Sequence, residues 1–405
     1  MLDVERARAL FPALASDWAL MDNAGGSAPA RHVIERVAAY MATTPVQHGA
    51  SYPLSLEAAA RVAEGRAAAA RLVNADPGEV VLGSSATVLL RRLAEALSPL
   101  WAPGDEVVVT DLDHEANIGP WRNLAAQGIV VREWGLNRES EALEPADLEP
   151  LLNARTRLVA FTHCANVVGT IHDARAIVER VHAAGALACV DGVAFAPHRR
   201  VDVRALGADF YTVSLYKVFG PHVGLLYGRR ALLEAARGTN HFFVPEDDVP
   251  RKLEPGSVPH ELAAGLPGIL ECFAELRGLP DAAALTAAEL DAFWADTARH
   301  EARLVEPLLA FLVAHPRVRV IGHPEADPAR RVATVAFTVD GRASSDVATA
   351  LESERLAVRW GHFYARRAMQ PLGVDPDQGI VRVGLAHYNT PDEVARLVRA
   401  LDGAL

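Results

Sequence analysis

The sequence predicts an α/β fold: a mostly parallel sheet covered by helices, followed by a smaller α+β domain. Short apolar runs rich in β-branched residues alternate with amphipathic helical patterns through the first part of the chain, as in βαβ units. After Pro259 this alternation gives way to long helical patterns rich in Ala, Leu and Glu. A chain of 405 residues, 50% of them hydrophobic, is also long for one core and natural for two domains.

The first part of the chain alternates predicted strands with predicted helices. The strands are short runs of branched and aromatic residues: Glu106–Thr110, Val130–Trp134, Leu158–Thr162, Ala186–Asp191, Asp209–Leu215 and Val223–Tyr227. Between them, apolar residues recur at helical spacing in Ser85–Leu97, Asn117–Ala126 and Ala174–Ala184. This order favours a parallel sheet with helices on both faces.

The C-terminal part begins with two long helical patterns and ends with mixed elements. The predicted helices are Glu261–Leu276, Ala287–His315, Ser345–Glu354 and Pro391–Leu401. The predicted strands are Val318–Ile321, Val332–Val339, Val358–Trp360 and Ile380–Leu385. We therefore expect a large domain at residues 17–265 and a small domain at residues 266–405, on which residues 1–16 pack.

Composition and charge exclude several classes of protein. The net charge is −11 and no run of Lys and Arg occurs, so nucleic acid is not an expected partner. No apolar run is long enough to span a bilayer, and the N-terminus lacks a signal peptide's apolar core. The 3 cysteines are too few for a disulfide scaffold, and Cys164 and Cys189 lie in apolar runs typical of buried thiols. We expect a cytoplasmic protein that binds no membrane.

Lys217 follows the predicted strand Asp209–Leu215. A lysine at the mouth of a buried strand loses solvation, which lowers the pKa of its amine and leaves more of the free form. A free amine condenses with an aldehyde to give a Schiff base. Asp191 ends a second predicted strand, and such a carboxylate can pair with a pyridine nitrogen. Taken alone, Lys217 is equally typical of a surface lysine and Asp191 of a residue that caps a helix or turn. Together, the two residues are the pair that a pyridoxal phosphate enzyme needs.

Other strand ends carry side chains suited to the same cofactor. Ser84 and Ser85 open a predicted helix, where backbone N–H groups and hydroxyls can bind a phosphate. His114 follows the strand Glu106–Thr110 and can stack on a pyridine ring. Asn166 follows a later strand and can donate to a phenolate oxygen. Taken singly, a helix cap, a surface-loop histidine and a turn asparagine are the alternatives.

Arg382 interrupts the predicted strand Ile380–Leu385. A guanidinium inside an apolar strand needs an anionic partner, and its fork geometry suits a carboxylate. An amino-acid substrate would supply that carboxylate, whereas an internal salt bridge is the alternative. The sequence thus predicts a site for pyridoxal phosphate and a small amino acid, with no metal ion.

These segments together resemble the class V aminotransferase family of fold-type I pyridoxal phosphate enzymes, most closely its cysteine desulfurase and selenocysteine lyase branch. The similarity extends from Leu20-Met-Asp-Asn-Ala-Gly-Gly to Tyr388-Asn-Thr-Pro-Asp-Glu. The segments around Lys217, Asp191 and His114 fall in the family's order. The resemblance implies the aspartate aminotransferase fold and a homodimer with a shared active site.

The resemblance also assigns roles to individual residues. Lys217, Asp191 and His114 are expected to be catalytic. The implied cofactor-binding residues are Ser84, Ser85, His114, Asn166, Asp191, Ser214, Tyr216, Lys217, Gly256 and Ser257. Of these, Tyr216 replaces a histidine that desulfurases usually carry, and Gly256 and Ser257 match a segment that reaches the phosphate of a second copy. The implied substrate-binding residues are Arg382, Asn23, Ala24, His48 and Tyr364.

Two departures from the desulfurase pattern affect the predicted reaction. Desulfurases carry a nucleophilic Cys on a loop of the second domain, but the matching stretch here, Gly361–Arg367, contains none. Persulfide transfer therefore lacks its acceptor, unless sulfur leaves directly as sulfide. The Gln usually found three residues after the pyridinium-binding Asp is Ala194, which removes one hydrogen bond to the phenolate oxygen.

The sequence therefore predicts a pyridoxal phosphate enzyme that acts on an amino acid, and a C–S lyase or other β-eliminating lyase is the first hypothesis. An aminotransferase or an epimerase on an unidentified amino acid is the alternative. A scaffold protein that kept the fold is a third class, against which the intact set of Lys217, Asp191 and His114 argues.

Overall fold

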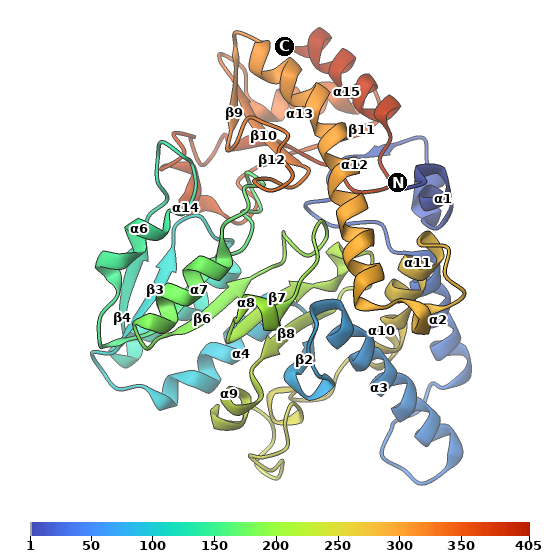
Figure 1. The fold of residues 1–405 in the computed structure, drawn as a ribbon, viewed down its shortest axis with the longest axis vertical. Coiled ribbons are helices and arrows are strands. Elements are labelled where there is room, and N and C mark those ends of the chain that lie inside the picture. Colours follow the sequence, from blue (N-terminus) through green and yellow to red (C-terminus); the bar gives the residue numbers. More distant parts are fainter. Residues whose placement is uncertain (1) are drawn as a thin grey trace.

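The computed structural model describes residues 2–405. The larger domain is built on a seven-stranded sheet (Figure 1). Its spatial order is β2 (Val80–Gly83), β8 (Gly224–Gly228), β7 (Phe210–Ser214), β6 (Leu187–Asp191), β5 (Thr156–Thr162), β3 (Glu106–Thr110) and β4 (Val130–Trp134). Strand β8 runs antiparallel to both neighbours, and the other pairs are parallel. The carboxyl ends of all strands but β8 therefore meet at one edge, where ligands bind in sheets of this kind.

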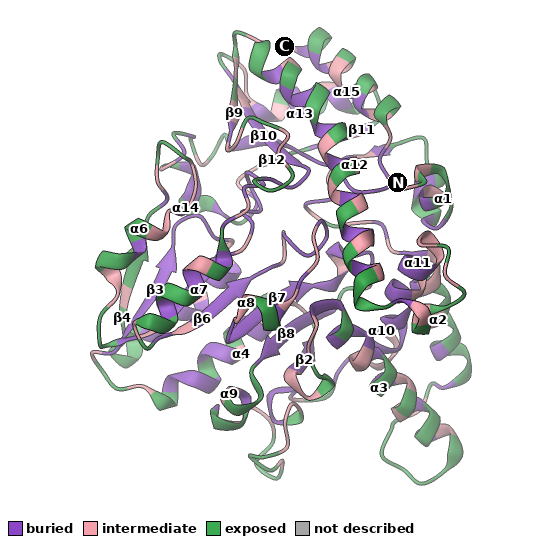
Figure 2. Ribbon diagram, in the orientation of Figure 1, coloured by how far each residue is buried: buried purple, intermediate pink, exposed green. Residues whose placement is uncertain are grey.

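Helices bury both faces of this sheet, which explains its nearly continuous apolar strands. Along β5, Val159 and Phe161 belong to one core cluster, whereas Leu158 and Ala160 belong to another. The first cluster includes residues of α2 (Arg31–Thr43), α3 (Pro53–Val73), α6 (Pro145–Leu148), α7 (Ala174–Ala183), α8 (Val203–Leu206), α10 (His260–Gly265) and α11 (Pro267–Leu276). The second includes residues of α4 (Ala86–Leu97), α5 (Gly119–Arg122) and α9 (Arg230–Ala235). Figure 2 shows the inner strands of the sheet buried and the outer turns of the helices exposed, whereas the edge strand β4 is mostly exposed.

The smaller domain is built on an antiparallel four-stranded sheet. Its order is β12 (Arg359–Gly361), β13 (Ile380–Gly384), β10 (Thr334–Val339) and β9 (Val318–Ile321). The core of this domain includes apolar residues of α12 (Ala287–Ala314), α13 (Ser344–Glu352) and α15 (Pro391–Ala404). The long helix α12 runs from this domain down beside the larger one (Figure 1), and the short α14 (Arg366–Met369) precedes β13.

The N-terminal segment joins the two domains. Helix α1 (Val4–Ala9) is followed by β1 (Ala19–Leu20), which pairs in parallel with β11 (Leu356–Ala357). The Phe11 ring lies 5.6 Å from that of Phe219 in the large domain and 4.8 Å from that of Tyr388. The segment before α2 therefore contacts both domains. The predicted division between residues 265 and 266 falls between α10 and α11 and stays a prediction.

The predicted helices differ from the observed ones where proline interrupts them. The predicted helix Asn117–Ala126 is instead the short α5 between two 3-10 turns, because Gly119 and Pro120 break the pattern. The predicted helix Glu261–Leu276 is two helices, α10 and α11, because Pro267 lacks an N–H donor. No helix within residues 2–405 is both long and apolar enough to cross a membrane.

Candidate active site

A cavity of about 630 Å³ lies where the parallel strands end, under a loop of the smaller domain. Thr162, Asp191 and Ser214, the last residues of β5, β6 and β7, line its floor, and Tyr364 lines it from the smaller domain. The structure thus brings together most of the residues predicted from the sequence. Those that line this cavity are Ser85, His114, Asn166, Asp191, Ser214, Tyr216, Lys217 and Tyr364.

Lys217 lies in the 3-10 turn Leu215–Lys217, which follows β7. The side chain is buried, and its Nζ donates to the Ala24 carbonyl oxygen at 2.7 Å. Burial lowers the pKa of the amine to about 8, and the Arg382 guanidinium adds to this effect, while Asp191 opposes it. Roughly a tenth of the amine is therefore free at pH 7, far more than for an exposed lysine, and the free form is the one that attacks a carbonyl.

Asp191 ends β6 and is buried at the cavity floor. One carboxylate oxygen, Oδ1, accepts a hydrogen bond from the Val193 N–H at 2.8 Å. Burial raises the pKa of the carboxyl to about 6, although this hydrogen bond and Lys217 oppose the shift. The next residue must be Gly192, because a Cβ there would lie 2.0 Å from the Tyr211 ring. The tight packing holds Asp191 in one position at the strand end.

His114 caps the 3-10 turn Glu115–Asn117. Its Nδ1 accepts a hydrogen bond from the Ala116 N–H at 3.0 Å, which places the ring proton on Nε2. Burial lowers the pKa of the imidazole to about 4, and Lys217 and Arg382 add to this effect. His114 is therefore a neutral ring at the cavity wall at physiological pH.

Asp113 is a site residue that the sequence analysis did not predict. It is buried and accepts hydrogen bonds from the Thr110 hydroxyl, from Asn117 Nδ2 at 2.6 Å and from the Thr162 N–H at 3.1 Å. Burial, reinforced by the nearby charge of Asp191, raises the pKa of its carboxyl to about 8. Asp113 thus ties the ends of β3 and β5 together and fixes the turn that carries His114. Its place beside His114 at a strand end was the available signal.

The N-terminus of α4 faces the same cavity. Ser85 is the N-cap residue, and its Oγ accepts from the Val88 N–H at 3.2 Å, while Ala86 and Thr87 line the cavity. The helix end lies directly on β8, because a Cβ at Gly224 would come within 2.4 Å of the Ser85 backbone. Free N–H groups at such an end suit a phosphate. Ser84 is exposed and does not line the cavity, so its predicted role gains no support from this geometry.

The loop between β12 and α14 covers the cavity from the smaller domain. Phe363 and Tyr364 both have positive φ, 49° and 61°, a conformation that costs energy for side chains of this size. The loop is held by Asn166 Nδ2, which donates to the Phe363 carbonyl at 2.9 Å, and by the Glu115 N–H, which donates to the Tyr364 carbonyl at 2.8 Å. The Tyr364 ring is exposed and lies 5.3 Å from that of His114. Tyr364 therefore stands at the cavity mouth.

Arg382 is buried beside the cavity, in β13. Its Nη2 pairs with Asp22 Oδ1 at 2.8 Å, its Nη1 donates to the Asn166 carbonyl at 3.1 Å, and its guanidinium lies 3.6 Å from the Phe363 ring centroid. The Nε atom is buried and has no partner within residues 2–405. The internal salt bridge weighed from the sequence is therefore present, and one buried donor is left for a further anion. The predicted role in substrate binding stays a prediction.

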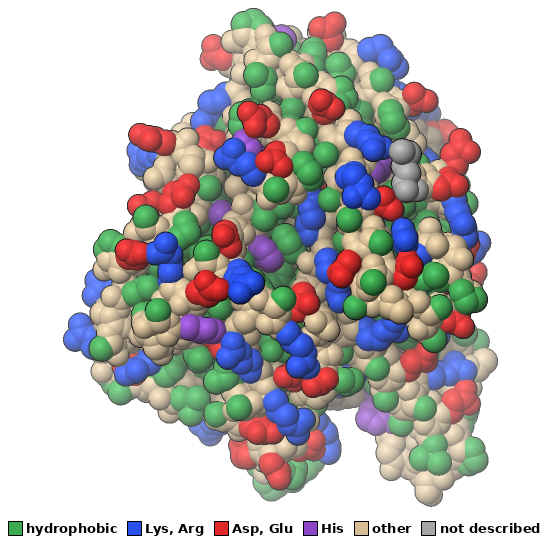
Figure 3. Space-filling view, viewed as in Figure 1, with side chains coloured by type: hydrophobic (Ala, Val, Ile, Leu, Met, Phe, Trp, Pro, Cys, Tyr) green, Lys and Arg blue, Asp and Glu red, His purple; other side chains and the backbone are tan. Residues whose placement is uncertain are grey.

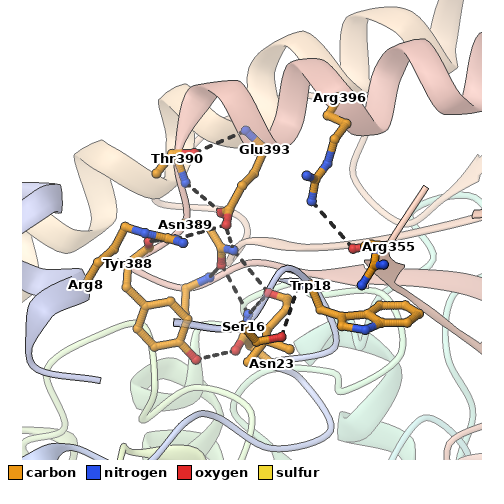
Figure 4. Close-up of polar contacts among 12 residues, drawn as sticks. Arg8, Ser16, Trp18, Asn23, Arg355, Tyr388, Asn389, Thr390, Glu393 and Arg396 are labelled. Carbon is orange, nitrogen blue, oxygen red and sulfur yellow. Dashed lines mark hydrogen bonds and ion pairs between the residues drawn. The ribbon is translucent and has the colours of Figure 1, made fainter. Parts of the chain in front are cut away.

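Asn23 and Ala24 do not line the cavity. The Asn23 side chain is committed to a buried network with Tyr388 and Asn389 (Figure 4), and its backbone N–H donates to the Gly384 carbonyl at 3.1 Å. Ala24 approaches the site through its carbonyl oxygen, which accepts from Lys217 Nζ. For both residues the predicted substrate contact remains untested.

His48, Gly256 and Ser257 lie together in a second hollow, which Gln47 and Asn240 also line. The His48 ring is 4.5 Å from that of His260, and Ser257 Oγ is 2.9 Å from His260 Nε2. The two loops that contribute to this hollow, between α2 and α3 and after α9, project from the lower edge of the molecule (Figures 1 and 3). Figure 3 also shows acidic and basic side chains intermixed over this face. These predicted residues are thus placed outside the cavity of their own chain.

The residues around the cavity fit pyridoxal phosphate. A partly free lysine amine, a buried carboxyl, a neutral imidazole and a helix N-terminus face one space. The Oδ1 atom of Asn166 is buried and, among the residues the structure describes, has no hydrogen-bond partner. No group of three or more His, Cys, Asp or Glu side chains within residues 2–405 is arranged to hold a metal ion.

Comparison with known proteins agrees with this geometry. The family model described as aminotransferase class-V matches residues 19–397. An aminotransferase-like protein of Gibberella zeae is 40% identical over 99% of this chain and 98% of its own length, and a cysteine desulfurase-like protein of Aspergillus flavus is 36% identical over 99% and 90%. The crystal structure of a cysteine desulfurase from Escherichia coli superposes with a TM-score of 0.84 and 28% identity, covering 100% of this chain and 98% of that one. The chain therefore belongs to the class V aminotransferase family, and it is a pyridoxal phosphate-dependent enzyme of fold type I.

Proposed function

We propose that the protein is a β-eliminating lyase that acts on an amino acid, most directly a C–S lyase. The observation that carries the proposal is the loop at the cavity mouth, residues 361–367, which presents Tyr364 and no cysteine. A desulfurase needs a thiol there to take sulfur from the substrate. Without it, a sulfur substituent leaves the β-carbon directly for solvent.

The cysteines elsewhere in the chain support this proposal. Cys164 lines the cavity but is buried, and burial raises the pKa of its thiol to about 12. Burial also raises the thiol pKa of Cys189 and Cys272. Because the thiolate is the form that attacks sulfur, these protonated thiols are poor acceptors near neutral pH.

Residues in and beside the cavity provide the groups that elimination needs. The Lys217 amine removes the proton from the substrate's α-carbon, and the unpartnered Nε of Arg382 donates to the substrate carboxylate. With pyridoxal phosphate bound, Asp191 would pair with the ring nitrogen, and the neutral His114 imidazole would pack against the ring. Bound pyridoxal phosphate supplies the electron sink that makes the α-proton acidic.

Transamination is the second candidate, and it is favoured by the 40% identity to an aminotransferase-like protein of Gibberella zeae. The same residues serve both reactions, because elimination and transamination differ only in the fate of the electrons left at the α-carbon. In transamination the nitrogen stays with the cofactor and a keto acid leaves. An epimerase, in which the α-carbon regains its proton on the other face, uses the same groups again.

We also propose that the protein is a homodimer and that it is cytoplasmic. The hollow that contains His48, Gly256 and Ser257 lies apart from the cavity of its own chain, which supports the proposal that these residues complete the cavity of a second copy. Exposed apolar side chains on the two loops nearby, Tyr52, Phe242 and Phe243, are consistent with a covered surface.

The deciding experiment is a product assay. The purified protein, loaded with cofactor, is incubated with a panel of amino acids and cysteine thiol conjugates, and sulfide, pyruvate, ammonia and other keto acids are measured together. Pyruvate and ammonia in equal amounts indicate elimination, because hydrolysis after loss of the β-substituent releases both. A keto acid without ammonia indicates transamination and contradicts the lyase proposal. Lys217→Ala is the control for reaction outside the site.

A further inference from the structure

The loop of residues 22–28, between β1 and α2, contacts the reactive groups of both domains. The Ala24 carbonyl accepts from Lys217 Nζ at 2.7 Å. It is the one hydrogen-bond partner of this amine among residues 2–405. Two residues earlier in the chain, Asp22 pairs with Arg382 at 2.8 Å and with Arg359 at 3.2 Å. A displacement of this loop would therefore change the surroundings of Lys217 and Arg382 together.

On the side of the large domain, Ser27 fixes the loop to the segment that carries Lys217. Its Oγ donates to the Tyr216 carbonyl at 3.1 Å and accepts from the Phe219 N–H at 3.0 Å. These two partners lie on either side of Lys217 in the sequence. The Ser27 hydroxyl thus sets the spacing between the loop and the lysine turn.

On the side of the small domain, Tyr388 fixes the same loop at two points (Figure 4). Its buried hydroxyl donates to Asn23 Oδ1 and accepts from the Ala28 N–H at 3.1 Å. Asn23 Nδ2 donates in turn to the Gly384 carbonyl at 2.9 Å and to Asn389 Oδ1 at 3.2 Å. One hydroxyl therefore closes residues 23–28 into a fixed turn. We call Asn23, Tyr388 and Asn389 the Tyr388 clamp.

A second set of contacts holds the clamp itself. Arg8 Nη1 donates to the Tyr388 carbonyl at 2.9 Å and pairs with Glu393 at 3.0 Å. Glu393 also accepts from Asn389 Nδ2 at 2.9 Å. The two sequence motifs at opposite ends of the chain, around Asn23 and around Tyr388, thus meet at the base of the active site.

We propose that Tyr388 is a positioning residue for Lys217: through Asn23 and Ala28 it aims the Ala24 carbonyl at the lysine amine and so gives the released lysine a fixed place to bind. A buried ammonium without an acceptor is costly, so the acceptor decides how readily the amine takes up a proton. The inference rests on the assignment of Lys217 as the cofactor lysine. It adds that the small domain controls the reactivity of that lysine through the turn.

The test measures the proton affinity of Lys217 in the full chain freed of cofactor. The chain contains 2 lysines, Lys217 and Lys252, so limiting acetic anhydride followed by peptide mass spectrometry resolves both. The rate of labelling against pH gives the pKa of Lys217, and Lys252 serves as the internal reference. Tyr388→Phe removes only the hydroxyl, and weakening the acceptor should lower the Lys217 pKa by about half a unit or more.

Tyr40→Phe is the matched control. Tyr40 is also buried, and its hydroxyl has no hydrogen-bond partner in the described part of the chain. Its removal should leave the Lys217 pKa unchanged. A folded Tyr388→Phe variant with the wild-type or a higher pKa would overturn the proposal, as would an equal fall in Tyr40→Phe.

Ser27→Ala loosens the same turn from the other side and decides the matter if Tyr388→Phe does not fold. It should also lower the Lys217 pKa, and an unchanged value overturns the proposal. This measurement uses no catalysis. If the Lys217 pKa falls in the variants but the wild type forms no product from any amino acid, the positioning role is supported and the proposed function is contradicted. If the wild type forms products but the Lys217 pKa is unchanged in the variants, the proposed function is supported and the positioning role is contradicted.

Discussion

Two buried polar clusters lie on either side of the Ala24 peptide, and they differ in how well their atoms are satisfied. In and beside the cavity, Asn166 Oδ1 and Arg382 Nε have no partner within residues 2–405, and burial shifts the pKa of Lys217 to about 8 and that of Asp191 to about 6. In the Tyr388 clamp, the side chains of Asn23, Tyr388 and Asn389 are joined by hydrogen bonds to one another and to the backbone.

The difference separates two uses of buried polar groups. An unpartnered buried donor or acceptor costs roughly 1–3 kcal/mol, so a fold keeps such atoms where a ligand supplies the missing partner. A fully bonded cluster needs no ligand and instead fixes geometry. On this argument the cavity performs the chemistry and the clamp positions it.

Lys217→Ala should have the largest effect. The variant loses the amine that binds the cofactor covalently and moves the proton, so turnover should fall by roughly a thousandfold or more. Borohydride reduction followed by peptide mapping should find the cofactor on Lys217 in the wild type and no adduct in the variant. An adduct at Lys252 in the wild type would contradict the assignment.

Lys252→Met is the matched control for this variant. Lys252 is also buried, but its Nζ donates to the carbonyls of Glu234 at 2.8 Å and Glu246 at 2.7 Å. Like the residues of the Tyr388 clamp, Lys252 has hydrogen-bond partners within the protein and therefore a structural role. The variant should keep the borohydride adduct on Lys217 even where its stability falls.

Arg382→Ala should lower kcat/KM on the true substrate by roughly a hundredfold or more, because the substrate carboxylate loses the Nε donor and Asp22 loses its buried charge partner. Arg359→Ala is the control, since Arg359 shares Asp22 but is more than half exposed. Its loss should change kcat/KM far less. Equal, small effects of both substitutions would return Arg382 to a purely structural role and remove it from the cavity cluster.

Much of the fold could be predicted from the sequence, because the strands of the large sheet and several of the helices that cover it have clear hydrophobic patterns. The strand Glu106–Thr110 was predicted to the residue, since an all-buried parallel strand is a continuous apolar run. Helices α2 and α3 were not predicted. Helix α3 is rich in Ala, which packs closely but gives weak amphipathic contrast. Its Gly65 contacts the Ala263 backbone, which is a tertiary constraint without a local signal.

The candidate site was predicted as far as its residues lie at strand ends. Asp191 ends an apolar strand, Lys217 and His114 follow one, and the parallel topology then brings all three to one cavity. Asp113 and the Tyr388 clamp could not be assigned in this way. Their partners are separated in sequence or are backbone groups, so only the folded chain shows that Tyr388 and Asn23 meet.

His387 is an exception to the division between the two clusters, because its polar atoms are unpartnered although it lies next to the Tyr388 clamp. It directly precedes Tyr388, yet it is fully buried and both of its ring nitrogens lack partners among the described residues. The ring lies 5.4 Å from that of Phe11 and 4.5 Å from that of Phe219. Burial lowers the pKa of the imidazole to about 3, and the neighbouring His300 and His198 add to this effect.

This residue should make the fold sensitive to acid. Because the imidazole pKa is lower in the folded than in the unfolded chain, the unfolded state binds more protons below about pH 6.5, and stability falls as pH falls. His387→Leu should remove about 2 kcal/mol of the loss in unfolding free energy between pH 7 and pH 5. Urea unfolding at the two pH values measures this, with exposed His241→Gln as the control. An identical pH dependence in wild type and His387→Leu contradicts the prediction.

Replacement of all three cysteines by Ala should have the smallest effect on activity. Cys164 lines the cavity, but burial raises the pKa of its thiol to about 12, so the thiolate that would attack sulfur is scarce near neutral pH. A folded variant should therefore retain activity on the true substrate within about twofold. Mass spectrometry of the wild type during turnover should find no sulfur adduct on any cysteine.

If the folded variant were inactive and the wild type carried a persulfide on Cys164, the protein would be a desulfurase whose nucleophile lies on the cavity floor instead of the Tyr364 loop. The proposal that sulfur leaves directly for solvent would then be wrong.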